Sequence, residues 1–145
     1  MIALLQRVTR ASVSIDGATT AVIDHGLLAL IAAQRDDDER RARRLAQRIL
    51  GYRMFADSDG RTNLNVARVD GAVLAVPQFT LAADTRSGNR PGFSTALAGS
   101  AAEPLFAACV AALQTGPVPI ATGRFGADMQ VALINDGPMT FRIES

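Results

Sequence analysis

The sequence predicts an α+β fold in which most of the sheet is antiparallel. Segments with strand character occupy both ends of the chain and alternate with two helical segments. Few of these strands are joined by the regular helical crossovers that a doubly wound sheet requires. No repeat, low-complexity tract or linker interrupts residues 1–145, so we expect a single domain.

Composition excludes several classes of protein. The chain has 145 residues, 48% of them hydrophobic, and at this length folding buries about two thirds of the unfolded surface. The net charge of +1 excludes nucleic-acid binding by bulk cationic attraction, so any such contact must be local. No apolar run reaches the roughly 20 residues that span a bilayer, and the start of the chain lacks a signal-peptide pattern. We therefore expect a cytoplasmic protein without membrane contact.

The first third of the chain predicts three strands. The β-branched content and partial alternation of Ile2–Ile15 favour one long strand, and the Asp16-Gly17 turn signal pairs it with residues 19–23. Gly26 ends this second strand. Residues 27–33 form a continuous apolar run, which is typical of a strand buried on both faces.

A helix is predicted next. The acidic residues 36–39 open it, because negative charge is favourable at the positive end of the helix dipole. Apolar residues recur at helical spacing from Ala42 to Leu50, and Gly51 ends the helix. Five arginines lie on it or at its start: Arg40, Arg41, Arg43, Arg44 and Arg48. We favour a solvated face with intrahelical ion pairs, and the alternative is a stripe that docks on RNA phosphates.

The middle of the chain is less regular. Residues 52–55 predict a short strand before a polar turn, and residues 73–76 predict a second buried strand. This second strand ends at Pro77-Gln78-Phe79-Thr80. Residues 82–91 are too polar and glycine-rich for regular structure, so we expect a loop there.

The last third predicts one helix and three strands. Proline is tolerated only in the first turn of a helix, so Pro104 places the helix start near Glu103. The helix continues to residue 113 and is almost entirely apolar, so we expect it to be buried, within its own chain or against another subunit. The final strands are Ile120–Thr122, 129–135 and 139–143, with a turn between the last two at Asp136-Gly137-Pro138.

Familiar catalytic motifs are absent from the sequence. It contains no nucleophile elbow, P-loop, dinucleotide-binding fingerprint or H-E-x-x-H motif. His25 lies between Asp24 and Gly26, where we expect a turn, and Cys109 lies midway along the apolar helix as a core residue. The sequence therefore predicts no pair of nucleophile and base, no metal site and no cofactor.

Polar residues stand instead at two positions where a pocket is expected. Gln78 and Thr80 follow a buried strand, and a strand end frees backbone N–H groups that can form an oxyanion hole. The second position is the turn that carries Asn135 and the Gly137-Pro138 pair. Taken alone, such a turn favours a simple hairpin, and the alternative is a functional cis-proline turn.

Taken together, several segments resemble the D-aminoacyl-tRNA deacylase family. The matching segments run from the first residue to Phe141 at the family's usual spacing: residues 1–13, Leu50-Gly51-Tyr52-Arg53, residues 78–85, Gly88-Asn89-Arg90-Pro91, residues 122–127 and Asn135-Asp136-Gly137-Pro138. The resemblance implies a barrel-like, layered ββα domain with mostly antiparallel or mixed sheets and two main helices. It also implies a homodimer that needs no cofactor.

The resemblance further implies an activity. Such proteins hydrolyse the ester that joins a D-amino acid to the 3′-terminal adenosine of tRNA, and they remove glycine from tRNA that should carry alanine. In this family the pair corresponding to Gly137-Pro138 is cis and enters the pocket of the partner subunit, where it leaves no room for an L side chain. Residues corresponding to Arg7 and Asn135 support that pair.

The motif Gln78-Phe79-Thr80 is similar to the family segment whose backbone holds the ester. Attack is assigned to water assisted by the ribose 2′-hydroxyl rather than to the threonine. Pro77 is a departure, because the family usually has serine there. It resembles a related branch that removes L-alanine from threonine tRNA, so relaxed chirality is an alternative function. A non-catalytic protein that binds the end of tRNA is another.

Overall fold

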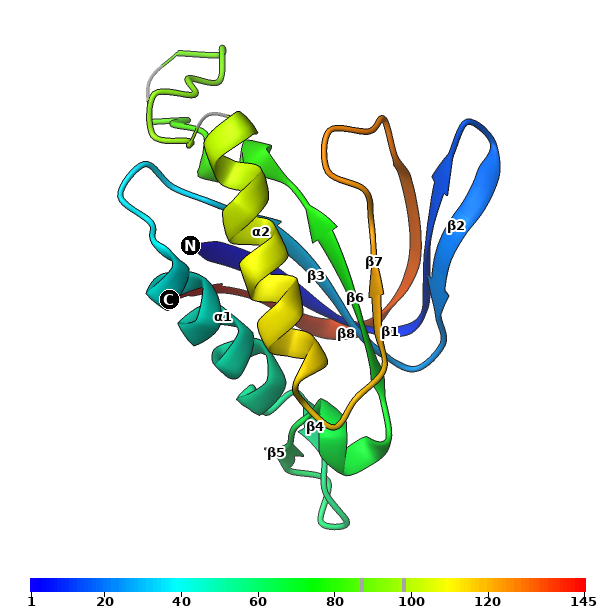
Figure 1. Cartoon of the computed structure of the whole chain (residues 1–145). Coiled ribbons are helices and arrows are strands. Elements are labelled where there is room, and N and C mark those ends of the chain that lie inside the picture. Colours follow the sequence, from blue (N-terminus) through cyan, green and yellow to red (C-terminus); the bar gives the residue numbers. More distant parts are fainter. Residues whose placement is uncertain (87, 98) are drawn as a thin grey trace.

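The computed structural model describes residues 1–86, 88–97 and 99–145. Within these ranges, six strands form one mixed sheet, and two helices lie side by side on one face of it (Figure 1). The strands are β1 (Ile2–Ile15), β2 (Ala18–Ile23), β3 (Gly26–Ala32), β6 (Ala72–Pro77), β7 (Ile120–Thr122) and β8 (Gln130–Glu144). The predicted α+β class is confirmed, and the sheet curves into a nearly closed, barrel-like form.

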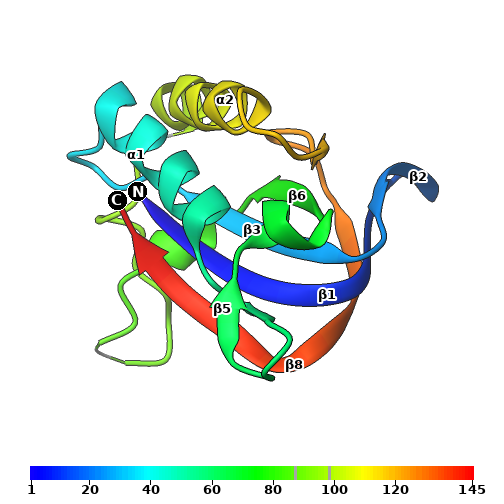
Figure 2. The same cartoon turned by 90° about the horizontal axis from the view of Figure 1, so that it is seen from below.

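β1 organises the sheet. It pairs antiparallel with β2 and β3 along one edge and with β8 along the other. The second half of the sheet is parallel: β3 pairs with β6, and β6 pairs with β7. Each parallel step crosses over through a helix, and Figure 2 shows both helices on the same side of the strands. Burial between two layers explains the continuous apolar runs of β3 and β6.

Helix α1 (Glu39–Gly51) begins where the acidic run ends. Asp38 caps it by accepting a hydrogen bond from the backbone N–H of Arg41 at 2.8 Å. Gly51 is the last helical residue, and Tyr52 forms the cap after it. The predicted strand over 52–55 is therefore wrong in its position, since β4 (Phe55–Ala56) starts later and pairs with β5 (Thr62–Leu64).

Helix α2 (Gly99–Gln114) differs from the prediction in two ways. It begins at Gly99 rather than near Glu103, so Pro104 lies inside it. The exposed start of the helix tolerates this, because the carbonyl that loses its N–H partner belongs to exposed Ser100. The helix is also not wholly buried. Its buried stripe is Ala102, Phe106, Cys109 and Leu113. Ala107 and Ala111 are exposed, whereas Ala108 and Ala112 are half-buried against the core.

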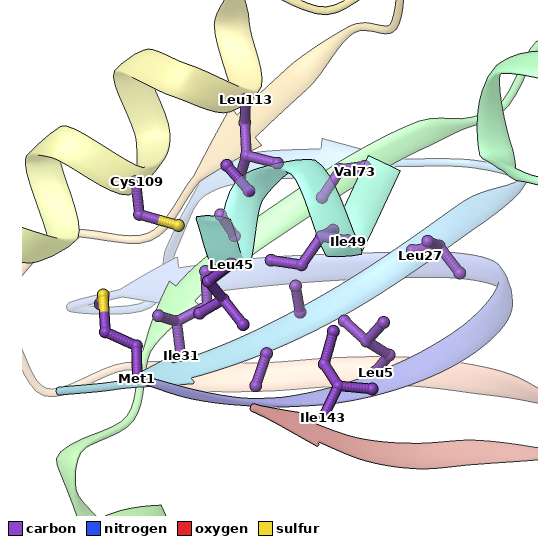
Figure 3. Close-up of a cluster of buried hydrophobic side chains, with 14 of the residues drawn as sticks. Met1, Leu5, Leu27, Ile31, Leu45, Ile49, Val73, Cys109, Leu113 and Ile143 are labelled. Carbon is purple, nitrogen blue, oxygen red and sulfur yellow. The ribbon is translucent and has the colours of Figure 1, made fainter. Parts of the chain in front are cut away.

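The main core lies between the two helices and one face of the sheet. Figure 3 shows Leu45 and Ile49 of α1 and Leu113 of α2 above apolar side chains of β1, β3 and β8. A second cluster fills the other face where the sheet curls, and it includes Val8, Leu28 and Val76. No helix in the described ranges is long and apolar enough to cross a membrane.

The end of the chain forms one strand where two were predicted. β8 is continuous, and no hairpin turn occurs at residues 136–138. Its pairing with β1 is interrupted, because Val8 faces Asn135 while Gln6 faces Thr140. Residues 136–139 therefore bulge outward opposite Arg7, and the strand resumes the same direction afterwards. Local turn chemistry suggested a reversal, but the long edge of β1 keeps both halves of β8 paired.

Candidate functional site

A pocket of about 510 Å³ opens at the carboxyl end of β6. Pro77, Gln78 and Phe79 form one side of it, and residues 125–129 of the β7–β8 connection line another. Leu97, Gly99 and Ala102 contribute from the start of α2 and the segment before it. Its surface is more apolar than polar, and Gln78 and Asp128 carry polar side chains there. Such a concave site with few polar groups is typical of small-ligand binding.

The backbone changes direction where it enters this pocket. The N–H of Gln78 donates to the carbonyl of Ile31 at 2.7 Å, which is the last hydrogen bond of the ladder between β3 and β6. The 3₁₀ turn η2 (Phe79–Ala82) follows at once. Among the described residues, the N–H groups of Phe79 and Thr80 have no hydrogen-bond acceptor. Two donors are therefore free at this turn, and Phe79, which carries the first of them, lines the pocket.

The side chains of this motif do not form a catalytic pair. The Gln78 amide Nε2 donates to Thr80 Oγ1 at 2.6 Å. An amide cannot accept the hydroxyl proton at its nitrogen, so this contact does not activate Thr80 as a nucleophile. Thr80 is exposed, and it does not line the pocket. The site can supply position and hydrogen-bond donors, which is the chemistry predicted for the strand end.

Pro77 fits the end of its strand without breaking the sheet. The ladder between β6 and β7 ends where Ala75 faces Thr122. Residue 77 lies beyond it, so the N–H that proline lacks has no strand partner on that side. Position 123 is packed closely here, since a Cβ on Gly123 would lie 3.3 Å from the Pro77 ring. Pro77 therefore shapes the wall of the pocket.

The second predicted group gathers around the bulge of β8. Arg7 donates from Nε to the carbonyl of Asp136 at 3.1 Å and from Nη1 to the carbonyl of Met54 at 2.7 Å. The Asn135 side chain donates from Nδ2 to the carbonyl of Arg7 at 2.9 Å. The peptide bond between Gly137 and Pro138 is cis. Arg7 and Asn135 thus hold the residues that precede this pair.

The two groups remain apart within one chain. Arg7 faces Leu27 at one end of β3, whereas Gln78 bonds to Ile31 near the other. Four residues of strand separate these points, which corresponds to about 13 Å. Gly137 and Pro138 are exposed and do not line the pocket of their own chain.

His25 and Cys109, which the sequence did not predict to be catalytic, do not line the pocket. His25 is exposed at a bend between β2 and β3, where its ring meets Phe55 edge-on at 5.2 Å. Burial raises the pKa of the Cys109 thiol to about 12, because the thiolate would lose its hydration. Among the residues that the structure describes, no three His, Cys, Asp or Glu side chains group as metal ligands would.

Sequence reasoning did not assign part of the pocket to the site. Residues 125–129 and the start of α2 reach it only because β6, β7 and α2 are neighbours in space. The Gly123-Arg124-Phe125-Gly126 segment between two strands was the available signal, since such a loop often carries function. Residue 87 of the predicted loop over 82–91 lies outside the described residues. On either side of it, Asp84 and Gly92 form a β-bridge, which the sequence did not indicate.

Comparison with known proteins agrees with these features. A family model described as D-Tyr-tRNA(Tyr) deacylase matches residues 4–144. The chain is 54% identical over 144 residues to a D-aminoacyl-tRNA deacylase of Citrobacter koseri, covering 99% of each chain. It is 56% identical over 141 residues to one of Methylococcus capsulatus, covering 97% of this chain and 92% of that protein.

Solved structures show the same fold. The structure titled c-Myc DNA Unwinding Element Binding Protein superimposes with a TM-score of 0.94 at 35% identity, covering 100% of this chain and 99% of that one. A probable eukaryotic D-amino acid tRNA deacylase superimposes with a TM-score of 0.84 at 14% identity, covering 99% and 98%. The resemblance of the motifs is confirmed: the chain belongs to the D-aminoacyl-tRNA deacylase family of hydrolases.

Proposed function

We propose that this chain, acting as a single domain over residues 1–145, hydrolyses D-aminoacyl-tRNA to free D-amino acid and tRNA. The observation that carries the proposal is the pocket beside Phe79, where the backbone N–H groups of Phe79 and Thr80 lack acceptors among the described residues. An aminoacyl ester is already activated. Positioning and stabilisation of an oxyanion are therefore sufficient to accelerate its hydrolysis.

In this mechanism, water attacks the carbonyl carbon of the ester. The 2′-hydroxyl of the terminal ribose assists by relaying the proton that this water loses. The N–H groups of Phe79 and Thr80 donate to the oxygen that becomes negative. The bond from the carbonyl carbon to the ribose 3′-oxygen then breaks, and that oxygen takes up a proton. Each such donor contributes about 3–4 kcal/mol to the transition state. The role of Gln78 is to hold the turn through Thr80.

Chirality is selected by exclusion across a homodimer. Gly137 and Pro138 of one subunit enter the pocket of the other, where rigid backbone blocks the side of the α-carbon on which an L side chain would lie. The surface around the bulge supports such an interface. β8 lies at the edge of the sheet, where it pairs with β1. Three of its large apolar side chains are exposed: Leu133 by 36%, Ile134 by 62% and Phe141 by 37%. An apolar sheet edge of this kind favours association with a second chain.

Glycine has no side chain to exclude, so glycine attached to alanine tRNA is also a substrate. Exclusion by backbone atoms makes no contact that would favour one D side chain over another. The enzyme therefore accepts many D-amino acids.

The direct test compares D-Tyr-tRNA, L-Tyr-tRNA, Gly-tRNA(Ala) and L-Ala-tRNA(Thr) as substrates of the purified protein. Hydrolysis of the D and glycyl esters alone is the expected result. Equal rates on D-Tyr-tRNA and L-Tyr-tRNA would reject selection by exclusion. Release of L-alanine would assign the function suggested by Pro77, and tight tRNA binding without turnover would identify a non-catalytic binder. The substitution Pro77→Ser distinguishes the L-alanine deacylase from the non-catalytic tRNA binder, because only the non-catalytic protein would gain hydrolytic activity.

A further inference from the structure

A second groove, of about 550 Å³, adjoins the pocket and shares Phe79, Leu97 and Gly99 with it. Phe79 and Phe93 are 55% and 45% exposed there, with ring centroids 5.4 Å apart and planes tilted by 49°. Aromatic rings so exposed, beside a pocket, provide a surface on which a flat molecule can stack. Neither ring is needed to fill the core.

A cation lines the same groove. Arg35 is exposed, and its guanidinium has no ion pair or hydrogen bond among the described residues. Asp84, which bridges to Gly92 next to Phe93, is paired with Arg86 at 2.9 Å, and neither Asp84 nor the neighbouring Asp36 forms an ion pair with Arg35 in the described ranges. The groove therefore combines a free guanidinium with stacking rings, which are the groups that bind phosphate and bases in single-stranded nucleic acid.

The groove is held in place by backbone contacts between its two sides. The N–H of Arg35 donates to the carbonyl of Thr95 at 3.2 Å, and the N–H of Leu97 donates to the carbonyl of Ala33 at 3.2 Å. Residues 34 and 96 form a β-bridge between these bonds. Arg35 and Phe93 are thus fixed relative to each other before any ligand arrives, which reduces the entropy lost on binding.

We propose that this groove binds the penultimate nucleotide of the tRNA, with its base stacked on Phe93 and the phosphate that follows it beside Arg35. The inference rests on the proposed function, which places the terminal adenosine ester in the adjoining pocket. The occupant follows from continuity, since the RNA chain must leave the pocket through a neighbouring opening. It also follows from charge, since Arg35 complements the phosphate that links the last two nucleotides.

The experiment uses three small substrates with a D-tyrosyl ester on the 3′-terminal adenosine. These are the adenosine alone, the dinucleotide CpA, and CpA with an abasic penultimate position. We expect kcat/KM for CpA to exceed that for adenosine by about tenfold, which is within the range for one stacked base. The abasic compound should lie between them, because it retains the phosphate alone.

Two variants assign the effect to the groove. Phe93→Leu should reduce the advantage of CpA over the abasic compound, and Arg35→Gln should reduce the advantage of the abasic compound over adenosine. Both should hydrolyse the adenosine ester like the parent protein, which also reports that they are folded. The matched control is Arg68→Gln, since Arg68 is an exposed arginine of the turn η1 (Val66–Val69) at the far end of β6.

Several results would overturn the inference. These are equal kcat/KM for CpA and adenosine in the parent protein, or an equal loss on all three substrates in the variants. Dissociation of a dimer in Phe93→Leu, measured by sedimentation, would assign the surface to a second copy of the chain.

If no substrate is hydrolysed, the proposed function fails. Tighter binding of uncharged CpA than of adenosine, measured by titration calorimetry and lost in both variants, would then still support the groove; equal binding would reject it.

Discussion

Arg7 and Asp136 join the bulge of β8 to β1 through an ion pair, with Nε of the guanidinium 2.8 Å from Oδ2 of the carboxylate. The Arg7 side chain is 14% exposed and the Asp136 side chain 43%. The same guanidinium also donates to the backbone carbonyls of Asp136 and Met54. One side chain therefore fixes the residue directly before Gly137 to two other parts of the fold.

Replacing Arg7 should loosen the bulge. Arg7→Gln removes the ion pair and at least one of the carbonyl contacts, so we expect a loss of about 1–2 kcal/mol in the free energy of unfolding. If the bulge excludes L side chains, the ratio of kcat/KM for D-Tyr-tRNA to that for L-Tyr-tRNA should fall about tenfold or more. Arg10→Gln is the control, because Arg10 is exposed on the same strand without an ion pair in the described ranges. An unchanged ratio in Arg7→Gln would show that the bulge does not select chirality.

A methyl group at position 137 should also disturb the site. A Cβ on Gly137 would lie 3.2 Å from Oδ1 of Asn135, whose amide holds the carbonyl of Arg7. We expect Gly137→Ala to lower D-Tyr-tRNA hydrolysis about tenfold or more and to change Tm by only a few degrees. Gly51→Ala is matched to it, because a Cβ there meets nothing within 4 Å. Full activity in Gly137→Ala would argue against insertion of this pair into a partner's pocket.

The Thr80 hydroxyl should matter less than the hydroxyl of the substrate. Thr80→Val loses the 2.6 Å contact with Gln78 but keeps the backbone N–H groups, so we expect a loss of less than about tenfold in single-turnover rate. Replacing the terminal ribose 2′-hydroxyl by hydrogen should cost about 10²–10⁴-fold, because it removes assistance to proton transfer. The reverse order of the two effects would assign the attack to Thr80.

Cys109 should be chemically inert in the folded protein. Burial raises the pKa of its thiol from the ordinary value of 9.0 to about 12, so almost no thiolate forms at pH 8. We expect no reaction with a thiol reagent in native buffer and rapid reaction in guanidinium chloride. The thiol ionises near pH 9 in the unfolded chain but stays protonated up to about pH 12 in the folded protein. The free energy of unfolding should therefore fall as pH rises from about 9 toward 12. In Cys109→Ala this contribution to the pH dependence should disappear.

The strands of the sheet were largely predictable because their signals are local. The alternation in β1, the Asp16-Gly17 turn and the apolar runs of β3 and β6 each lie within a few residues. The start of α1 followed from its acidic run, but the start of α2 was less predictable. α2 begins at Gly99 because the exposed side of its first turns tolerates Pro104, and exposure is a property of the folded chain.

The residues of the site were named from the sequence, but their arrangement was not. The motif at Gln78 and the Gly137-Pro138 pair are recognisable from residue types and from the family resemblance. Residues 125–129, which complete the pocket, approach Gln78 only through the parallel pairing of β6 with β7. Arg35 and Phe93 are far apart in the chain, and the bridge between residues 34 and 96 with its two flanking hydrogen bonds brings them together.

The amino-acid sequence by itself determined where the two helices and most of the strands lie, and it carried the motifs of the deacylase family. These properties depend on the periodicity and identity of near neighbours. Only the tertiary structure decided that β8 passes through its Gly-Pro segment without turning back, and that this segment lies away from the pocket of its own chain. The physical reason is that pairing along the whole of β1 forms more hydrogen bonds and buries more surface than a local hairpin would.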